Sequence, residues 1–141
     1  MCAKTFRRHG KILLGVTAFV GLFSYVYERY AHGVRSNAMI FAFVYPLVLG
    51  VLPAFAFGAL RVLRDVPYAS AVRAGVNLYL SGVATLTMGS LAFGVVEIFG
   101  TTNRLLPMYD KVGWPLLAAG ALVTVVGLAL GVNRASAEKE A

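Results

Sequence analysis

The sequence predicts an all-α membrane protein built as a bundle of four transmembrane helices. Hydrophobic residues make up 59% of the 141 residues and charged residues only 13%, about half the charged share that is usual in soluble domains. The mean hydropathy is +0.75. A soluble protein of this size has too little interior to bury so much apolar surface, so we expect a single integral membrane domain over residues 1–141.

Four apolar runs are long enough to cross a membrane, since about 20 helical residues span about 30 Å of hydrocarbon. They cover residues 12–30, 38–60, 74–100 and 112–132. None shows the alternation that is typical of barrel strands. Residues 1–11 are predicted to form a basic tail, and residues 133–141 a polar, frayed tail. The chain is therefore expected to form two hairpins with short outer loops.

The basic residues predict the orientation, because lysine and arginine collect on the cytoplasmic side. Nine of the thirteen lie on the side of the two tails: Lys4, Arg7, Arg8, Lys11, Arg61, Arg64, Arg73, Arg134 and Lys139. The other four are Arg29, Arg35, Arg104 and Lys111. We therefore expect both termini to be cytoplasmic, in a bacterial inner membrane. This bias accounts for most of the net charge of +7, and the predicted partner is lipid rather than nucleic acid.

Small residues recur at helical spacing in three of the four runs. The expected packing residues are Gly50, Ala54 and Gly58 in the second run, Gly75, Gly82 and Gly89 in the third, and Gly113, Gly120, Gly127 and Gly131 in the fourth. Seven residues make two helical turns, so the seven-spaced sets lie on one face of each helix. Membrane helices associate through such faces. The stripes predict packing within the bundle, within a homo-oligomer or against a larger membrane protein.

The second run also contains Pro46 and Pro53. Each proline removes a backbone donor and can kink a helix. Kinks can create a cavity or a hinge, but they are also routine in membrane helices. We favour a structural role for both prolines.

Four ionisable residues near the outer span ends are the functional candidates: Glu28, His32, Glu97 and Asp110. Burying charge in lipid is expensive, which makes such residues informative. Glu28 and His32 are four residues apart and share a helical face. Glu28 and Glu97 lie near the ends of two spans that run in the same direction. If they converge, they suit a proton relay or a divalent cation such as Zn²⁺ or Mn²⁺, with Asp110 as a further ligand.

A simpler interpretation is that these residues form ordinary ion pairs at a wet interface. Glu28 would pair with Arg29, Arg35 or His32, and Glu97 with Arg104. The candidates lack tight metal-ligand spacing, so we favour this interpretation. We expect no metal and no cofactor.

The sequence carries no enzyme signature of the GxSxG, HExxH or P-loop type, and we expect no catalytic residue. In length and span number it is similar to small multidrug transporters. Those proteins place a glutamate well inside the first span, whereas Glu28 lies near its outer end, so no site residue is carried over. We expect an interaction or accessory subunit, or a homo-oligomer, in a membrane assembly. The alternative is a small transporter or ion-conducting protein with an outer-facing Glu/His site for protons or a divalent cation.

Overall fold

The computed structural model describes residues 2–31, 35–64, 66 and 69–140, and every regular element in this part is helical. In chain order the elements are α1 (Cys2–Tyr30), α2 (Asn37–Ile40), the π-helix η1 (Tyr45–Val51), α3 (Leu52–Ala59), the 3₁₀-helix η2 (Arg61–Arg64), α4 (Ser70–Ile98) and α5 (Pro107–Glu140). The second span, Asn37–Ala59, consists of α2, η1 and α3. It and the helices α1, α4 and α5 are long and apolar enough to cross a membrane. This confirms the predicted fold class.

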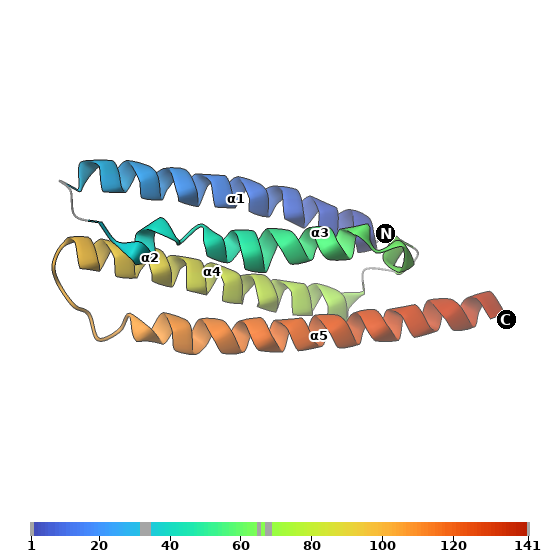
Figure 1. Cartoon of the computed structure of the whole chain (residues 1–141). Helices are drawn as coiled ribbons and strands as arrows, with labels where there is room; N and C mark the ends of the chain where they lie inside the picture. The colour runs from blue at the N-terminus through green and yellow to red at the C-terminus, as the bar shows by residue number, and fades with distance from the viewer. Residues whose placement is uncertain (1, 32–34, 65, 67–68, 141) are drawn as a thin grey trace.

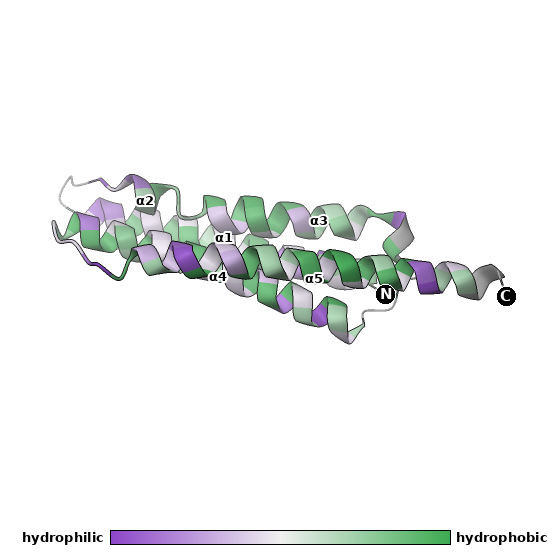
Figure 2. Ribbon diagram, turned by 90° about the horizontal axis from the view of Figure 1, so that it is seen from below, coloured by the Kyte–Doolittle hydropathy of each residue, from purple (hydrophilic) through white to green (hydrophobic). Residues whose placement is uncertain are grey.

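Each span packs mainly on the next one along the chain. α1 lies against η1 and α3, the second span lies against α4, and α4 and α5 form the most extensive pair. Figure 1 shows both chain termini at one end of the molecule, which we call the termini end. The opposite end, where α1 is joined to α2 and α4 to α5, is the loop end. Hydrophobic residues dominate the middle of the spans, and hydrophilic residues gather toward the ends (Figure 2).

Two helices extend beyond their predicted ends. α1 begins at Cys2, so the basic segment predicted as a tail is the first part of the helix. The segment contains no proline, and Cys2 and Phe6 are buried, which stabilises these first turns. At the other terminus α5 continues to Glu140, through the segment predicted to be frayed. That segment is rich in alanine and glutamate, which favour a helix.

The glycine stripes of α4 and α5 face each other at very short range. A Cβ atom added at Gly75 would lie 2.6 Å from the backbone nitrogen of Thr124, and one added at Gly82 would lie 2.6 Å from that of Leu117. A Cβ atom at Gly120 would meet the backbone of Tyr79. The remaining glycines of this seam would meet side chains: Gly89 that of Tyr109, Gly113 that of Leu86, Gly127 that of Val72, and Gly131 that of Val66. The two stripes therefore pack inside one chain.

Small residues of the second span let α1 approach it. A Cβ atom at Gly50 would lie 3.3 Å from the side chain of Leu13, and one at Gly58 would lie 2.7 Å from Cγ of Arg7. The Nε–H of Arg7 also donates to the Gly58 carbonyl at 3.0 Å. Ala54, one turn before Gly58, is buried. The nearest α1 atoms here belong to side chains, whereas Gly75, Gly82 and Gly120 of the α4–α5 seam would meet backbone atoms.

The second span is discontinuous rather than one kinked helix. α2 ends at Ile40, turns follow at residues 41–43, and η1 leads into α3. In an α-helix the Leu49 carbonyl would accept from residue 53, but Pro53 has no N–H. The hydroxyl of Tyr79 in α4 donates to that carbonyl instead, at 2.6 Å.

A second hydroxyl of α4 serves the other side of the break. The Ala38 carbonyl, which the early end of α2 leaves without its helical donor, accepts from Oγ of Ser90 at 2.6 Å. An unpaired carbonyl in lipid costs several kcal/mol. Two polar side chains of α4 thus complete the backbone of the second span.

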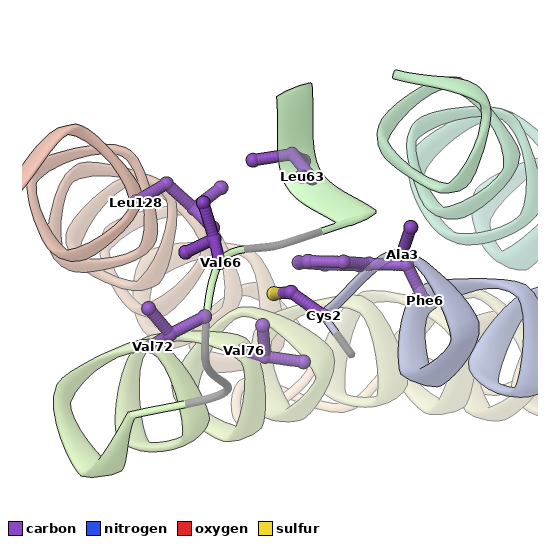
Figure 3. Close-up of a cluster of buried hydrophobic side chains, with 8 residues drawn as sticks. All are labelled: Cys2, Ala3, Phe6, Leu63, Val66, Val72, Val76 and Leu128. Carbon is purple, nitrogen blue, oxygen red and sulfur yellow. The ribbon is translucent and has the colours of Figure 1, made fainter. Parts of the chain in front are cut away.

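A cluster of buried apolar side chains closes the termini end (Figure 3). It consists of Cys2, Ala3, Phe6, Leu63, Val66, Val72, Val76 and Leu128. The backbone N–H of Cys2 donates to the Val66 carbonyl at 3.2 Å, which fixes the start of α1 to the connection between the hairpins. We refer to these eight residues as the terminal plug.

The α4–α5 seam predicts a position-specific cost for a single methyl group. Gly120→Ala is expected to lower the free energy of unfolding by about 1–3 kcal/mol, because the new Cβ forces the two backbones apart. Gly15→Ala in α1 is the matched control, since its Cβ would meet nothing within 4 Å. It should be neutral or stabilise by up to about 1 kcal/mol. Reversible unfolding in detergent micelles measures both, and equal effects would contradict the seam.

The repair of the Leu49 carbonyl predicts coupling between Tyr79 and Pro53. Tyr79→Phe is expected to cost about 1–2 kcal/mol, because it leaves the carbonyl unpaired in an apolar environment. Pro53→Ala restores a backbone donor, so Tyr79→Phe should cost less in that background. A double-mutant cycle of unfolding free energies measures the difference. The same cost in both backgrounds would show that the hydroxyl does not serve this carbonyl.

Candidate functional site

Ser36 is the centre of a polar cluster at the loop end. Ser36 is fully buried, with 0% exposure, and it caps the N-terminus of α2. The Ser36 Oγ accepts from the backbone N–H of Met39 at 3.3 Å. Serine is favoured in this position because the first N–H groups of a helix have no partner within it. The local sequence therefore explains why α2 begins here.

Two glutamates from different spans converge on this serine. Glu28, near the end of α1, accepts through Oε1 from the backbone N–H of Ser36 at 3.4 Å. Glu97, near the end of α4, accepts through Oε2 from the Ser36 hydroxyl at 2.5 Å. The first and third spans are thus linked through the start of the second. We call Glu28, Ser36 and Glu97 the carboxylate–serine site.

The site carries two carboxylates without a cationic partner in the described part of the chain. No ion pair joins Glu28 to Arg29 or Arg35, or Glu97 to Arg104, so the described residues do not form the predicted pairs. Glu28 is half-buried and Glu97 is exposed. Two like charges held at one residue repel each other, and a bound proton or cation relieves that repulsion.

The other two candidates do not join this cluster within the described residues. His32 lies outside the residues that the structure describes. Asp110 is exposed near the start of α5, where it lines a separate cavity of 270 Å³ together with Tyr45 and Ser90. Over residues 2–31, 35–64, 66 and 69–140 there is no group of three or more His, Cys, Asp or Glu residues that could hold a metal ion. The described residues therefore supply two carboxylates rather than a full ligand set.

A cavity of 380 Å³ lies beside the carboxylate–serine site. It is lined by Tyr27, Tyr30, Ala31, Ile98 and Phe99. Tyr27 and Tyr30 flank Glu28 along α1, and Ile98 follows Glu97 directly. Neither glutamate lines this cavity, so it neighbours the site without containing a carboxylate.

The pattern of charged residues in the sequence does not indicate Ser36 as part of a site. The signal was present, because a serine directly before a short apolar segment is typical of a helix N-cap. That signal predicts a helix start but not its neighbours. Only the folded loop shows that both glutamates reach the same serine.

No known protein family, curated protein or solved structure matches this chain. The chemistry of the site is therefore argued from its own geometry.

Removing the Ser36 hydroxyl tests the cluster directly. Ser36→Ala is expected to lower the free energy of unfolding by about 1–2 kcal/mol, because the N-cap of α2 and the bond to Glu97 are both lost. Ser81→Ala is the control, since Ser81 is exposed on α4 and its hydroxyl bonds only to the Asn77 carbonyl of its own helix. Thermal unfolding in micelles compares the two. A Ser36→Ala variant as stable as Ser81→Ala would contradict the observed contacts.

Proposed function

We propose that the protein is a small transporter or ion-conducting membrane protein that binds a proton or a divalent cation at the carboxylate–serine site. One observation supports this above all: Glu28 and Glu97, from different spans, meet at a buried serine without a cationic partner among the described residues. This favours the transport alternative over the interaction role, because the glycine stripes that suggested a partner are used within the chain.

The chemistry of the site suits a small cation. Carboxylate oxygens bind protons and are common ligands of divalent metals. Oε2 of Glu28 and Oε1 of Glu97 form no hydrogen bond in the described part of the chain, which leaves them for a ligand. A site of this kind at the end of a membrane span is where ion pathways and proton relays are found.

The discontinuous second span provides a way to couple binding to movement. Glu28 and Glu97 hold Ser36, and Ser36 holds the first turn of α2. The turns at residues 41–43 separate α2 from η1 and α3. Neutralising either carboxylate weakens its hydrogen bond to Ser36 and so loosens the start of α2, while the Ser90 hydroxyl still holds the Ala38 carbonyl. Broken helices beside binding sites serve this purpose in many transporters.

We further infer that the site faces the outside of the cell. The termini end carries nine of the thirteen basic residues, and the loop end carries four. The positive-inside rule then places both termini in the cytoplasm. The short loops and the absence of a soluble domain in this sequence are compatible with a bacterial inner membrane.

Flux measurements in proteoliposomes test the proposal. Liposomes loaded with a pH-sensitive dye, and a parallel set loaded with a Mn²⁺-sensitive dye, should report cation entry with the wild-type chain. Glu28→Gln and Glu97→Gln should each abolish the flux that is observed, because the amide cannot bind the cation as a carboxylate does. Asp110→Asn is the control, since Asp110 lies at the same end but outside the site.

The unfolding transition of each variant shows whether it is folded. Unchanged flux in both folded glutamine variants would overturn the proposal, and so would an equal loss in Asp110→Asn.

A second candidate function is an accessory subunit or homo-oligomer, and the surface of α1 favours it. Phe19, Phe23 and Tyr27 form a row of ring contacts, with centroids 6.5 Å and 5.9 Å apart. Phe19 is 69% exposed and Phe23 is 41% exposed, so these two rings face away from the bundle. Aromatic rows of this kind suit a neighbouring membrane protein as well as lipid. A wild-type chain without flux that stays in a complex after gentle extraction would favour this role.

A further inference from the structure

One buried hydroxyl in the described part of the chain has no hydrogen-bond partner. It belongs to Ser24 of α1, which is 5% exposed. Five other hydroxyls of the spans donate to the carbonyl four residues earlier in their own helix: those of Thr17, Ser81, Thr85, Thr87 and Thr124. A buried polar group without a partner lowers the stability of a fold. Ser24 is therefore a candidate contact for the cation.

Ser24 lies one turn inward from Glu28 on the same face of α1. The four residues between them correspond to about 6 Å along the helix axis. Long side chains on a helix lean toward its N-terminus, so the Glu28 side chain extends in the direction of Ser24. Oε2 of Glu28 forms no hydrogen bond with a described residue. Two hydrogen bonds of about 2.8 Å through one water molecule can link this carboxylate to the hydroxyl.

Ser24 lies at the level of the break in the second span. The Glu28 carboxylate meets Ser36, and a Cβ atom added at Gly21 would lie 3.8 Å from Cβ of Phe43. These two contacts fix the antiparallel register of α1 and the second span. Ser24 is then opposite the end of α2, where the turns at residues 41–43 begin. The hydroxyl thus lies between the carboxylate–serine site and the interrupted backbone.

The surroundings of Ser24 contain few groups that could compete with it for a proton. Residues 12–27 of α1 carry no charged side chain, and neither does the second span, Asn37–Ala59. The next serine or threonine inward is Thr17, whose hydroxyl is already bonded within its own helix. The acidic residue of α4 at this end is Glu97, which belongs to the carboxylate–serine site. Ser24 is therefore the polar group that follows Glu28 inward along α1.

We propose that the cation of the carboxylate–serine site is a proton, and that Ser24 passes it inward from Glu28. This inference rests on the proposed function and selects one of its two cations. A serine hydroxyl accepts a hydrogen bond while it donates its own hydrogen. It takes up a proton from water on the Glu28 side and gives its own to water on the side of the break, so only O–H bonds form and break. Mn²⁺ prefers six oxygen ligands and gains little from one hydroxyl a turn away from the carboxylates.

Proton flux into dye-loaded proteoliposomes tests the role of Ser24. Ser24→Ala removes only the hydroxyl oxygen and should reduce the wild-type proton flux at least about tenfold. Its unfolding temperature should be unchanged or higher, because a buried hydroxyl without a partner is lost. Thr17→Val is the matched control, since Thr17 is 8% exposed on the same helix and its hydroxyl bonds to the Leu13 carbonyl. This variant should keep the wild-type flux.

The possible outcomes separate this inference from the proposed function. Wild-type proton flux with Ser24→Ala would overturn the inference and leave the proposed function standing, and so would a wild-type chain that carries Mn²⁺ but no protons. A wild-type chain that carries neither would overturn both. An equal loss of flux in Thr17→Val, or a Ser24→Ala chain that also unfolds at a lower temperature, would assign the hydroxyl to packing instead.

Discussion

A backbone carbonyl in the hydrocarbon core of a membrane has no water molecule to donate a hydrogen bond to it, and this constraint determines how the second span is held. Pro53 and the early end of α2 leave two carbonyls of that span without helical donors, and the hydroxyls of Tyr79 and Ser90 supply them. Both donors belong to α4, whose Gly75, Gly82 and Gly89 pack against α5. α4 is therefore the element that joins the two hairpins.

The same break in the second span makes α2 a separate short helix at the loop end. Because turns separate α2 from η1, the position of α2 depends on the contacts of Ser36 and on the packing of Ala38 and Met39 against α4. Ser36 is held by Glu28 and Glu97, and it also accepts hydrogen bonds from Met39 and Ile40 of α2. A change of charge at either glutamate thus acts on a short segment first.

The sequence predicts much of the fold because lipid sets the length and polarity of each span. The sequence also predicts which helix faces carry small residues. It does not predict that Gly82 meets the backbone of Leu117, because that contact depends on the axial register of the two helices. Pro46 and Pro53 predict kinks, whereas the extent of unwinding depends on donors from α4. The sequence does not predict that Glu28 and Glu97 converge, because the loop that carries Ser36 has no periodic pattern from which its fold could be inferred.

The hydrogen bond between Tyr79 and Leu49 has a consequence for biogenesis. The two residues are 30 positions apart, so the second span emerges from the ribosome before its donor does. Until α4 packs beside the second span, the Leu49 carbonyl needs another hydrogen-bond donor, from water or from the insertion machinery. The first hairpin therefore cannot be released alone into the bilayer in its final form, and the third span must enter beside it.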